Sequence, residues 1–206
     1  MNAVRLLVAS NNAKKLKELC DLLKGLPYEI AGLSEFQGME EVPENGSTFE
    51  QNASAKALGY ARQTGLLTLA EDSGLCCDAL DGAPGIYSAR FSGAKKNDHE
   101  NNLKVLRLLK KVPDNCRGAY FKSAVAIANH EKVLGIMTGE VHGVIGHEIK
   151  GSNGFGYDVI FFYPPFRKTF GEVPAEMKYQ VSHRFKALVK AKELLEVFSG
   201  TEHKAK

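Results

Sequence analysis

The stretch VRLLVASNNAKKLKELCDLL limits the possible folds most strongly, because a strand passes into a helix within a few residues. Residues 4–9 form a short apolar run, which predicts a buried strand. Ser10 and Asn12 are helix-capping residue types, and leucines follow at helical spacing, at positions 16, 19, 22 and 23. A strand, a turn and a helix in this order are typical of an α/β protein.

Apolar and turn patterns also predict the elements that follow. We expect a polar loop over residues 33–46, a helix from about Thr48, a strand LLTLA that ends at EDSG, and a long connection over residues 76–97. A further helix over residues 101–111 would carry Leu103, Leu106 and Leu109.

The last third of the chain reads as strands and then a helix. Two β-rich runs, residues 119–128 and 132–146, predict a hairpin because a short polar segment parts them. A strand at GFGYDVIFF follows. A final helix is expected from about Ser182 to Phe198, with an inner face made of Phe185, Leu188, Leu195 and Phe198.

This order predicts an α/β fold with a mixed sheet and two lobes beside a cleft. The chain has 206 residues, of which 44% are hydrophobic, enough for one sizeable core or for two lobes that share one. We expect a single domain over residues 1–206, with residues 200–206 as a flexible tail.

Charge and composition argue against several functions. The formal net charge is only +3, from 27 basic and 24 acidic residues, which suits an anionic small molecule better than a nucleic acid. No stretch approaches the ~18 apolar residues of a membrane span, and the first apolar run is too short for a signal peptide. The four cysteines show no CxxC pair and no zinc spacing, which indicates reduced, mostly buried thiols. We expect a cytoplasmic protein without nucleic-acid or membrane partners.

Candidate phosphate-binding residues stand at the start of the first predicted helix. They are Ser10, Asn11, Asn12, Ala13, Lys14 and Lys15. Backbone N–H groups at a helix start attract anions, and basic side chains there oppose the helix dipole unless something negative binds. An ordinary N-cap followed by solvated lysines is the alternative interpretation.

Two acidic stretches are candidate cation sites. Glu71 and Asp72 are expected at the C-terminal end of a strand, where α/β sheets place their ligands. Neighbouring strand residues point to opposite faces, so only one of the two would face the cleft, to hold Mg²⁺ or to take a proton from water. Glu40, Glu41 and Glu44 could supply a second ligand. The alternatives are a turn acid and a solvated loop.

The stretch GSNGFGYD, residues 151–158, combines glycines with aromatic rings. Glycine permits positive φ and close approach of a ligand to the backbone, and Phe155 and Tyr157 would offer rings to a flat purine. Asp158 would either hydrogen-bond a base edge or hold the loop. A Gly-rich β-turn is the alternative interpretation.

Basic residues also stand at the start of the last predicted helix. Ser182 resembles an N-cap, and His183 and Arg184 follow it, with Lys178 close by. The guanidinium fork of arginine suits a carbonyl or phosphate oxygen. A purely structural histidine is the alternative.

Together these motifs resemble the inosine triphosphate pyrophosphatase family, whose members act on non-standard purine nucleotides. The resemblance covers nearly the whole chain. It rests on Ser10, Asn12, Lys15 and Glu18; on Ala70, Glu71, Asp72, Ser73 and Gly74, where many relatives have Asp in second place; on GAPGIYSARFSG; on GFGYDVIFF; and on Ser182, His183 and Arg184.

The resemblance implies a long curved mixed sheet with two α/β lobes flanking a nucleotide-binding cleft, usually in a homodimer. It implies hydrolysis of ITP, dITP or XTP to the monophosphate and pyrophosphate, with Mg²⁺. Asp72 would be the general base and a metal ligand, and Glu44 a second metal ligand. The triphosphate would be held by Ser10, Asn11, Asn12, Ala13, Lys14, Lys15, Ser73 and Lys178, and the base by Phe155, Gly156, Tyr157, Asp158, His183 and Arg184.

Two other functions stay open at this point. One is a related pyrophosphatase that prefers modified pyrimidine nucleotides. The other is a non-catalytic nucleotide-binding module, against which the acidic pair and the lysines argue.

Overall fold

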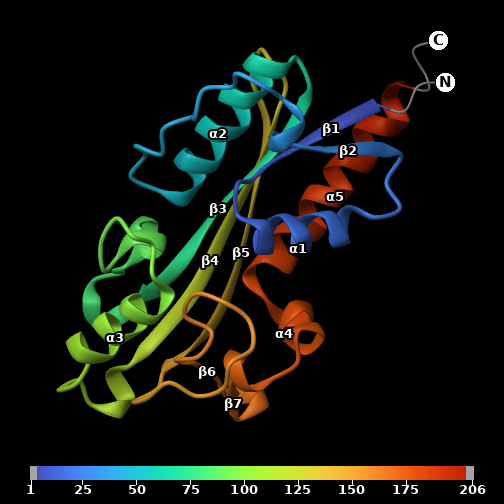
Figure 1. The fold of residues 1–206 in the computed structure, drawn as a ribbon. Coiled ribbons are helices and arrows are strands. Elements are labelled where there is room, and N and C mark those ends of the chain that lie inside the picture. The colour runs from blue at the N-terminus through green and yellow to red at the C-terminus, as the bar shows by residue number, and fades with distance from the viewer. Residues whose placement is uncertain (1–3, 203–206) are drawn as a thin grey trace. The chain divides into compact units, whose positions relative to one another are not determined.

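The structure, a computed structural model, describes residues 4–202, with side chains described as far as residue 199, so most of the predicted tail over residues 200–206 lies outside the described part. Seven strands in this part pair in the order β2-β1-β3-β4-β5-β6-β7 (Figure 1). Their bounds are β1 Val4–Ala9, β2 Tyr28–Gly32, β3 Leu67–Cys77, β4 Gly118–Ala128, β5 Val133–Ile145, β6 Phe161–Tyr163 and β7 Lys168–Thr169. β1 is parallel to β2 and β3, whereas β6 is antiparallel to β5 and β7. The predicted mixed α/β class is confirmed.

The chain divides into two compact units. The first contains residues 1–72, 123–139 and 185–206, and the second contains residues 73–122 and 140–184. Each unit is therefore built from separate stretches of the sequence, and the strands β3, β4 and β5 each contribute residues to both.

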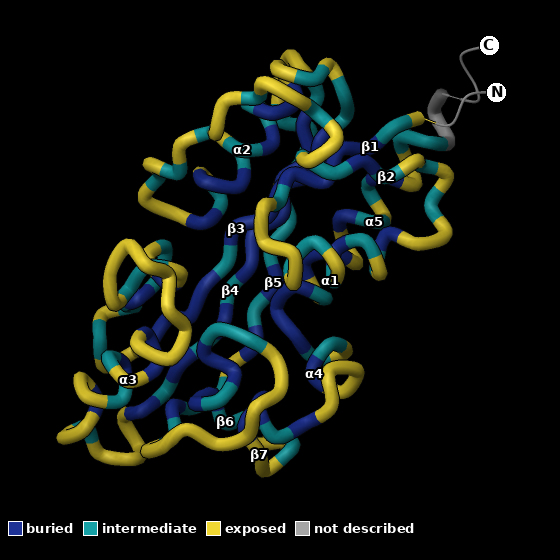
Figure 2. Tube along the Cα trace, viewed as in Figure 1, coloured by how far each residue is buried: buried dark blue, intermediate teal, exposed yellow. Residues whose placement is uncertain are grey.

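Two helices cover one face of the strands in the first unit. α1 (Ala13–Leu23) and α5 (His183–Glu202) lie beside one another in Figure 1. One buried cluster joins them to the strands; it includes Leu6, Val8, Leu19, Leu23, Leu69, Leu188 and Leu195. The alternate residues of β1, Leu7 and Ala9, are also buried, on the face that α2 (Phe49–Thr64) packs against. β1 is therefore covered on both faces (Figure 2), as expected for a parallel strand.

The ends of α2 follow from its sequence. The Thr48 hydroxyl accepts a hydrogen bond from the N–H of Gln51, 3.1 Å away, and so caps the first turn. Gly65 ends the helix with φ of 71°, a left-handed conformation that glycine adopts without a steric penalty. The predicted helix start at Thr48 is confirmed.

Aromatic side chains dominate the core of the second unit. The ring of Phe161 lies 4.7 Å from that of Phe121 and 5.1 Å from that of Phe170, measured between ring centroids. Leu75 and Val105, from β3 and from α3 (Asp98–Leu108), pack in the same cluster. The predicted hairpin of β4 and β5 is present, and its turn is closed in the first unit by the N–H of Asn129 donating to the Lys132 carbonyl.

The prediction that a strand ends at EDSG is wrong, because β3 continues to Cys77. Acidic and small polar residues are typical of turns, yet here tertiary hydrogen bonds satisfy them inside the strand. The carboxylates of Glu71 and Asp72 accept hydrogen bonds from Ser123 and Asn52. Gly74 also belongs in the strand, because a side chain there would collide with Ser88 and the Gly85 carbonyl.

The predicted strand at GFGYDVIFF is also shorter than expected. Only residues 161–163 of it are extended and paired, as β6. Gly151, Gly154 and Gly156 have φ of 79°, 75° and 62°, which a regular strand cannot contain. The preceding stretch therefore forms turns, in agreement with the alternative of a Gly-rich turn.

Other differences concern short elements. β2 and α4 (Ala175–Val181) were not predicted, and α3 begins at Asp98, three residues before the expected start. Leu109, the C-cap residue of α3, is buried, but Leu103 within the helix is 42% exposed. On α5, Leu188 and Leu195 are fully buried as predicted.

The cysteines agree in part with expectation. All four are free, and Cys76 and Cys77 are buried, but Cys116 is exposed. Burial raises the pKa of the Cys77 thiol to about 12, so this group stays protonated at neutral pH. Within residues 4–202, no helix has the length and apolar content needed to cross a membrane.

Candidate functional site

The turn between β1 and α1 gathers the predicted phosphate-binding residues. Asn12 caps α1, because its Oδ1 accepts hydrogen bonds from the N–H groups of Lys14 and Lys15, at 3.0 and 3.1 Å. The N–H of Asn12 in turn donates to the Ser10 hydroxyl, 3.3 Å away. The first turn of α1 contains no acidic residue, and its charged residues, Lys14 and Lys15, are unfavourable to the positive end of the helix dipole. Asn11 and Ala13 are exposed in the same turn.

The Glu71 carboxylate neutralises part of this local positive charge. β1 ends at Ala9, which pairs with Ala70 of β3. Glu71 is the next residue of β3, beyond the end of β1. Its Oε2 lies 3.0 Å from the Lys15 ammonium, and its Oε1 accepts a hydrogen bond of 2.9 Å from Ser123. The Glu71 carboxylate is thus engaged in holding Lys15.

Asp72 has different surroundings, because neighbouring residues of a strand face opposite sides. Its Oδ2 accepts a hydrogen bond of 3.0 Å from the Asn52 side chain of α2, and the residue is only 7% exposed. Burial raises the pKa of the Asp72 carboxyl group, and the nearby ammonium groups of Lys56 and Lys15 offset part of this rise. Asp72 therefore contacts Asn52 of α2, whereas Glu71 contacts Lys15 of α1, as expected for neighbouring residues that point to opposite faces.

Lys56 is a further charged residue at this site, and sequence reasoning missed it. Its ammonium group donates to Oε1 of Glu44 at 3.0 Å and to the carbonyl oxygen of Glu71 at 2.8 Å. Asn52 and Lys56 are four residues apart on α2, which places both on the face that meets β3. That spacing, directly after the acidic loop, is the signal that would have identified them.

The residues of this group fit a divalent cation. Mg²⁺ is usually bound by one or two carboxylates together with phosphate oxygens and water, so Glu44 and Asp72 would suffice as protein ligands. Desolvation of Asp72 supports this assignment, because a buried carboxylate with a raised pKa gains from a nearby cation. Within residues 4–202, no group of three or more His, Cys, Asp or Glu side chains forms a metal site made by the protein alone.

The glycine-rich stretch of the second unit is held by Asp158. This residue is 1% exposed, and its Oδ2 accepts a hydrogen bond of 2.9 Å from the N–H of Phe155 and contacts the Lys178 ammonium. Gly154 is required beside it, because a Cβ there would collide with the same carboxylate. Two roles were expected for Asp158, and these contacts correspond to the second, holding the loop.

Two cationic side chains lie near the ring of Phe155. The Lys178 ammonium lies 4.8 Å and the Arg184 guanidinium carbon 5.4 Å from the centroid of this ring. Tyr157 differs from expectation, because it is 4% exposed and belongs to the core of the second unit. Its hydroxyl donates to the Ser88 carbonyl at 2.8 Å, so its ring is not offered to a ligand.

His183 and Arg184 are both buried at the start of α5. The His183 ring stacks on Phe121, with 4.9 Å between ring centroids and 13° between ring planes. Arg184 is 2% exposed, and its Nη2 donates to the Ser73 hydroxyl at 3.2 Å. Ser73, Phe155 and Arg184 are therefore neighbours within the second unit.

The predicted site residues thus form two groups. The first unit holds Ser10, Asn11, Asn12, Ala13, Lys14, Lys15, Glu44 and Asp72, and the second holds Ser73, Phe155, Gly156, Tyr157, Asp158, Lys178, His183 and Arg184. The peptide bond between Asp72 and Ser73 joins the two groups covalently. Lys178, which was expected at the triphosphate, contacts Asp158 and Phe155 of the second group.

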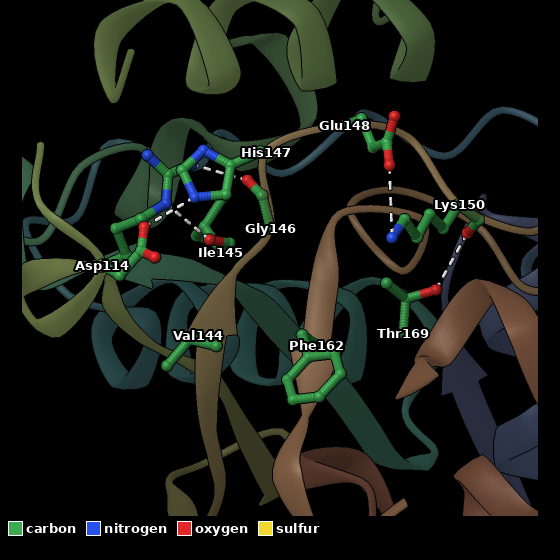
Figure 3. Close-up of a pocket in the computed structure, with 10 residues that line it drawn as sticks. Asp114, Val144, Ile145, Gly146, His147, Glu148, Lys150, Phe162 and Thr169 are labelled. Carbon is green, nitrogen blue, oxygen red and sulfur yellow. Dashed lines mark hydrogen bonds and ion pairs between the residues drawn. The ribbon is translucent and has the colours of Figure 1, made fainter. Parts of the chain in front are cut away.

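A pocket of about 360 Å³ lies elsewhere in the second unit (Figure 3). Its walls include Val144, Phe162 and Arg117, and at its rim His147 and Asp114 point toward one another, with 2.7 Å between Nε2 and Oδ1. None of the predicted site residues lines it. The three N–H groups of Arg117 that form recorded hydrogen bonds donate to backbone carbonyls, so this arginine supports the chain locally.

Known proteins are similar to this chain in sequence and in fold. The dITP/XTP pyrophosphatase of Desulforamulus reducens is 49% identical over 192 residues, which cover 93% of this chain and 96% of that protein. The dITP/XTP pyrophosphatase of Geobacter sulfurreducens is 46% identical, again over 93% of this chain and 96% of its own. The solved structure of a Ham1 protein from Coxiella burnetii superposes with a TM-score of 0.86 at 39% identity, covering 93% of this chain and 98% of that one.

The extent of these matches confirms the resemblance that the motifs predicted. The sequence pattern described for the Ham1 family matches residues 6–194. We conclude that this chain belongs to the Ham1 family.

Proposed function

We propose that this chain hydrolyses non-standard purine nucleoside triphosphates, such as dITP and XTP, to the monophosphate and pyrophosphate. The observation that carries the proposal is the buried Asp72 carboxylate, which Asn52 orients and whose charge is balanced by Lys15 and Lys56. The relatives that match over 93% of the chain are dITP/XTP pyrophosphatases, which supports the same reaction.

In the proposed reaction, Asp72 accepts a proton from water as the water oxygen attacks the α-phosphorus. The bond between the α-phosphorus and the bridging oxygen to the β-phosphorus breaks, and pyrophosphate leaves with the electron pair. Lys15 and Lys56 would neutralise the negative charge that develops on the leaving group. Mg²⁺, held by Glu44 and Asp72, would supply further charge neutralisation when bound.

The second group of residues would select the base. Phe155 would stack on the purine, and Arg184 would donate a hydrogen bond to the oxygen at purine position 6. Adenine carries an amino group there, so donor would meet donor, and an unpaired buried polar group costs about 1–3 kcal/mol. Arg184→Ala should therefore reduce the preference for ITP over ATP roughly tenfold or more.

Pyrophosphate release from a panel of nucleotides tests the proposal. We expect fast, Mg²⁺-dependent release from ITP, dITP and XTP, and slow release from ATP, GTP and dUTP. Fast turnover of modified pyrimidine nucleotides instead, or binding without release, would contradict it. For Arg184→Ala, the exposed Arg107→Ala is the matched control, and an equal loss on ITP and ATP would mean that Arg184 binds without selecting.

Two further properties belong to the same proposal. We propose that the enzyme acts in the cytoplasm and, as the family resemblance implies, as a homodimer. Sedimentation equilibrium should then report twice the mass of the chain, and a monomer at micromolar concentration would contradict the dimer.

A further inference from the structure

One turn of α3 holds the peptide groups of Gly156 from both sides. The Oδ2 atom of Asp98 accepts a hydrogen bond from the N–H of Gly156, at 2.8 Å. The Nδ2 atom of Asn102 donates to the carbonyl oxygen of Gly156, also at 2.8 Å. Asp98 and Asn102 are four residues apart and therefore share one face of the helix.

These contacts fix the residue that precedes Gly156. The N–H of Phe155 is held by Asp158, and the next N–H along the chain, that of Gly156, is held by Asp98. The Phe155 Cα therefore lies between two anchored peptide groups. Because no regular ladder pairs this stretch, side chains must supply partners for its backbone groups. The direction of the Phe155 ring thus depends on both carboxylates.

Asn102 is suited to this contact rather than to packing. It is 2% exposed, and its Nδ2 also donates to the Asp98 carbonyl at 2.7 Å. Within the described part of the chain, its Oδ1 atom has no hydrogen-bond partner. A buried acceptor without a partner destabilises a fold, so the two donor contacts, one of them to Gly156, account for an amide at this position.

The helix dipole alone does not explain Asp98. An acidic residue in the first turn of a helix is stabilising, but Glu100 occupies the same turn of α3 and would serve equally. The Gly156 N–H donates its hydrogen bond to Asp98. A comparison of variants at Asp98 and at Glu100 therefore separates an effect on the helix dipole from an effect on the loop.

We propose that Asp98 and Asn102 are positioning residues that hold the Phe155 loop in the conformation that binds the purine base. This inference rests on the proposed function, since it assigns the base to Phe155. It implies that the two residues affect the affinity for the base part of a nucleotide and leave the handling of the phosphate chain unchanged.

The first test compares Asp98→Ala, Asp98→Asn and the control Glu100→Ala. Loss of a hydrogen bond to a charged acceptor should raise KM for ITP about tenfold in Asp98→Ala, with kcat within about twofold, because ground state and transition state lose the same contact. Asp98→Asn should restore most of the affinity, since its amide oxygen can accept the same hydrogen bond. Glu100→Ala should behave as the wild type does.

Inorganic tripolyphosphate separates the base from the phosphate chain. As a competitive inhibitor it carries no base, so its Ki in the presence of Mg²⁺ should be the same in Asp98→Ala and in the wild type. A tenfold rise in this Ki would overturn the proposal, because it would place the effect at the phosphates. Asn102→Asp should raise KM for ITP more than Asn102→Ala does, since a carboxylate would face two carbonyl oxygens in place of a donor.

Hydrogen exchange tests the same inference without nucleotide, and so independently of the proposed function. The Gly156 amide should exchange at least about tenfold faster in Asp98→Ala than in Glu100→Ala, because exchange follows local opening. Equal exchange in the two variants, or an equal KM for ITP, would overturn the positioning role. If the wild type releases no pyrophosphate from ITP while exchange still differs, the proposed function fails and the anchoring of the loop stands.

Discussion

Asp72 and Glu71 are neighbours in β3, yet the structure assigns them different tasks. Glu71 meets Lys15 and Ser123 on one face of the strand, whereas Asp72 meets Asn52 on the other. The Glu71 side chain therefore serves a contact with Lys15 and leaves the Asp72 carboxylate to its own partners. This leaves Asp72 as the acid whose ionisation state should control the reaction.

Replacing Asp72 should separate activity from stability. Asp72→Asn removes the proposed base, so kcat for ITP should fall by at least about 10²-fold. The folded-state pKa of Asp72 is raised above its ordinary value of 3.8, so the ionised carboxylate costs stability above this raised pKa. The neutral asparagine should therefore be more stable than the wild type at pH 7, and urea unfolding measures the difference.

The same linkage fixes how this difference depends on pH. As the pH falls through the raised pKa towards 3.8, the wild type takes up its proton and the advantage of the asparagine should disappear. Asp21→Asn is the control, because the hydrogen bond from Lys24 lowers the pKa of this exposed carboxyl group. It should bring no gain in stability, and a stabilisation by Asp72→Asn that persists unchanged at pH 3 would contradict the assignment.

Lys56 should matter for both rate and pH dependence. Its charge lowers the pKa of Asp72, so Lys56→Gln should raise that pKa and move the acidic limb of the kcat/KM profile to higher pH. Loss of its charge at the leaving group should also lower kcat by roughly 10²-fold. Lys17→Gln removes an exposed lysine of the same unit and should change neither. An acidic limb that stays in place would show that Asp72 does not set it.

Residue types and spacing predicted part of this site. The cap at Asn12 and the basic turn after it follow from local pattern, because each involves residues close in sequence. Lys56 and Asn52 did not follow, since their role depends on how α2 packs against β3. The hydrogen bond from the Lys56 ammonium group to the backbone carbonyl of Glu71 is an example, because these residues lie 15 positions apart in the sequence.

At the scale of elements, the stretch from Gly151 to Ile160 shows why local composition can mislead. Strand-forming residues follow the glycines, yet three left-handed glycines and the buried Asp158 impose turns. The competing interpretation, a Gly-rich turn, was the correct one for this stretch. β3 shows the reverse error, because turn-forming residues were accommodated in a strand by Ser123 and Asn52.

Two glycines of this loop should differ in their tolerance of alanine. At Gly156, with φ of 62°, an added Cβ meets nothing within 4 Å, so Gly156→Ala should cost only the backbone penalty, about 1–2 kcal/mol. At Gly154, with φ of 75°, the Cβ would also collide with the Asp158 carboxylate. Gly154→Ala should therefore cost clearly more than Gly156→Ala, measured as the free energy of unfolding in urea. Equal costs would mean that Asp158 moves aside freely.

At the scale of the whole molecule, the sequence predicted the α/β class and the family, but not how the chain is shared between two compact units. Periodicity describes one segment at a time, whereas the first unit needs residues 1–72, 123–139 and 185–206 together. Its core joins Leu6 and Leu69 to Val125 of β4 and to Leu188 and Leu195 of α5. No contiguous fragment shorter than residues 6–195 contains this set.

This sharing makes a prediction about truncation. A chain that ends at Arg184 loses α5 from the first unit, including the fully buried Leu188 and Leu195, and each such leucine contributes about 2–5 kcal/mol by comparison with alanine. Because typical domains are stable by only 5–15 kcal/mol, the first unit should not fold in this chain. Hydrogen exchange should then show β1 unprotected, while Leu188→Ala alone should leave a folded but weakened protein.

The exposed Val189→Ala and Val197→Ala are the controls and should change stability by less than about 0.5 kcal/mol. Native-like protection of β1 in the truncated chain would mean that the first unit folds without α5.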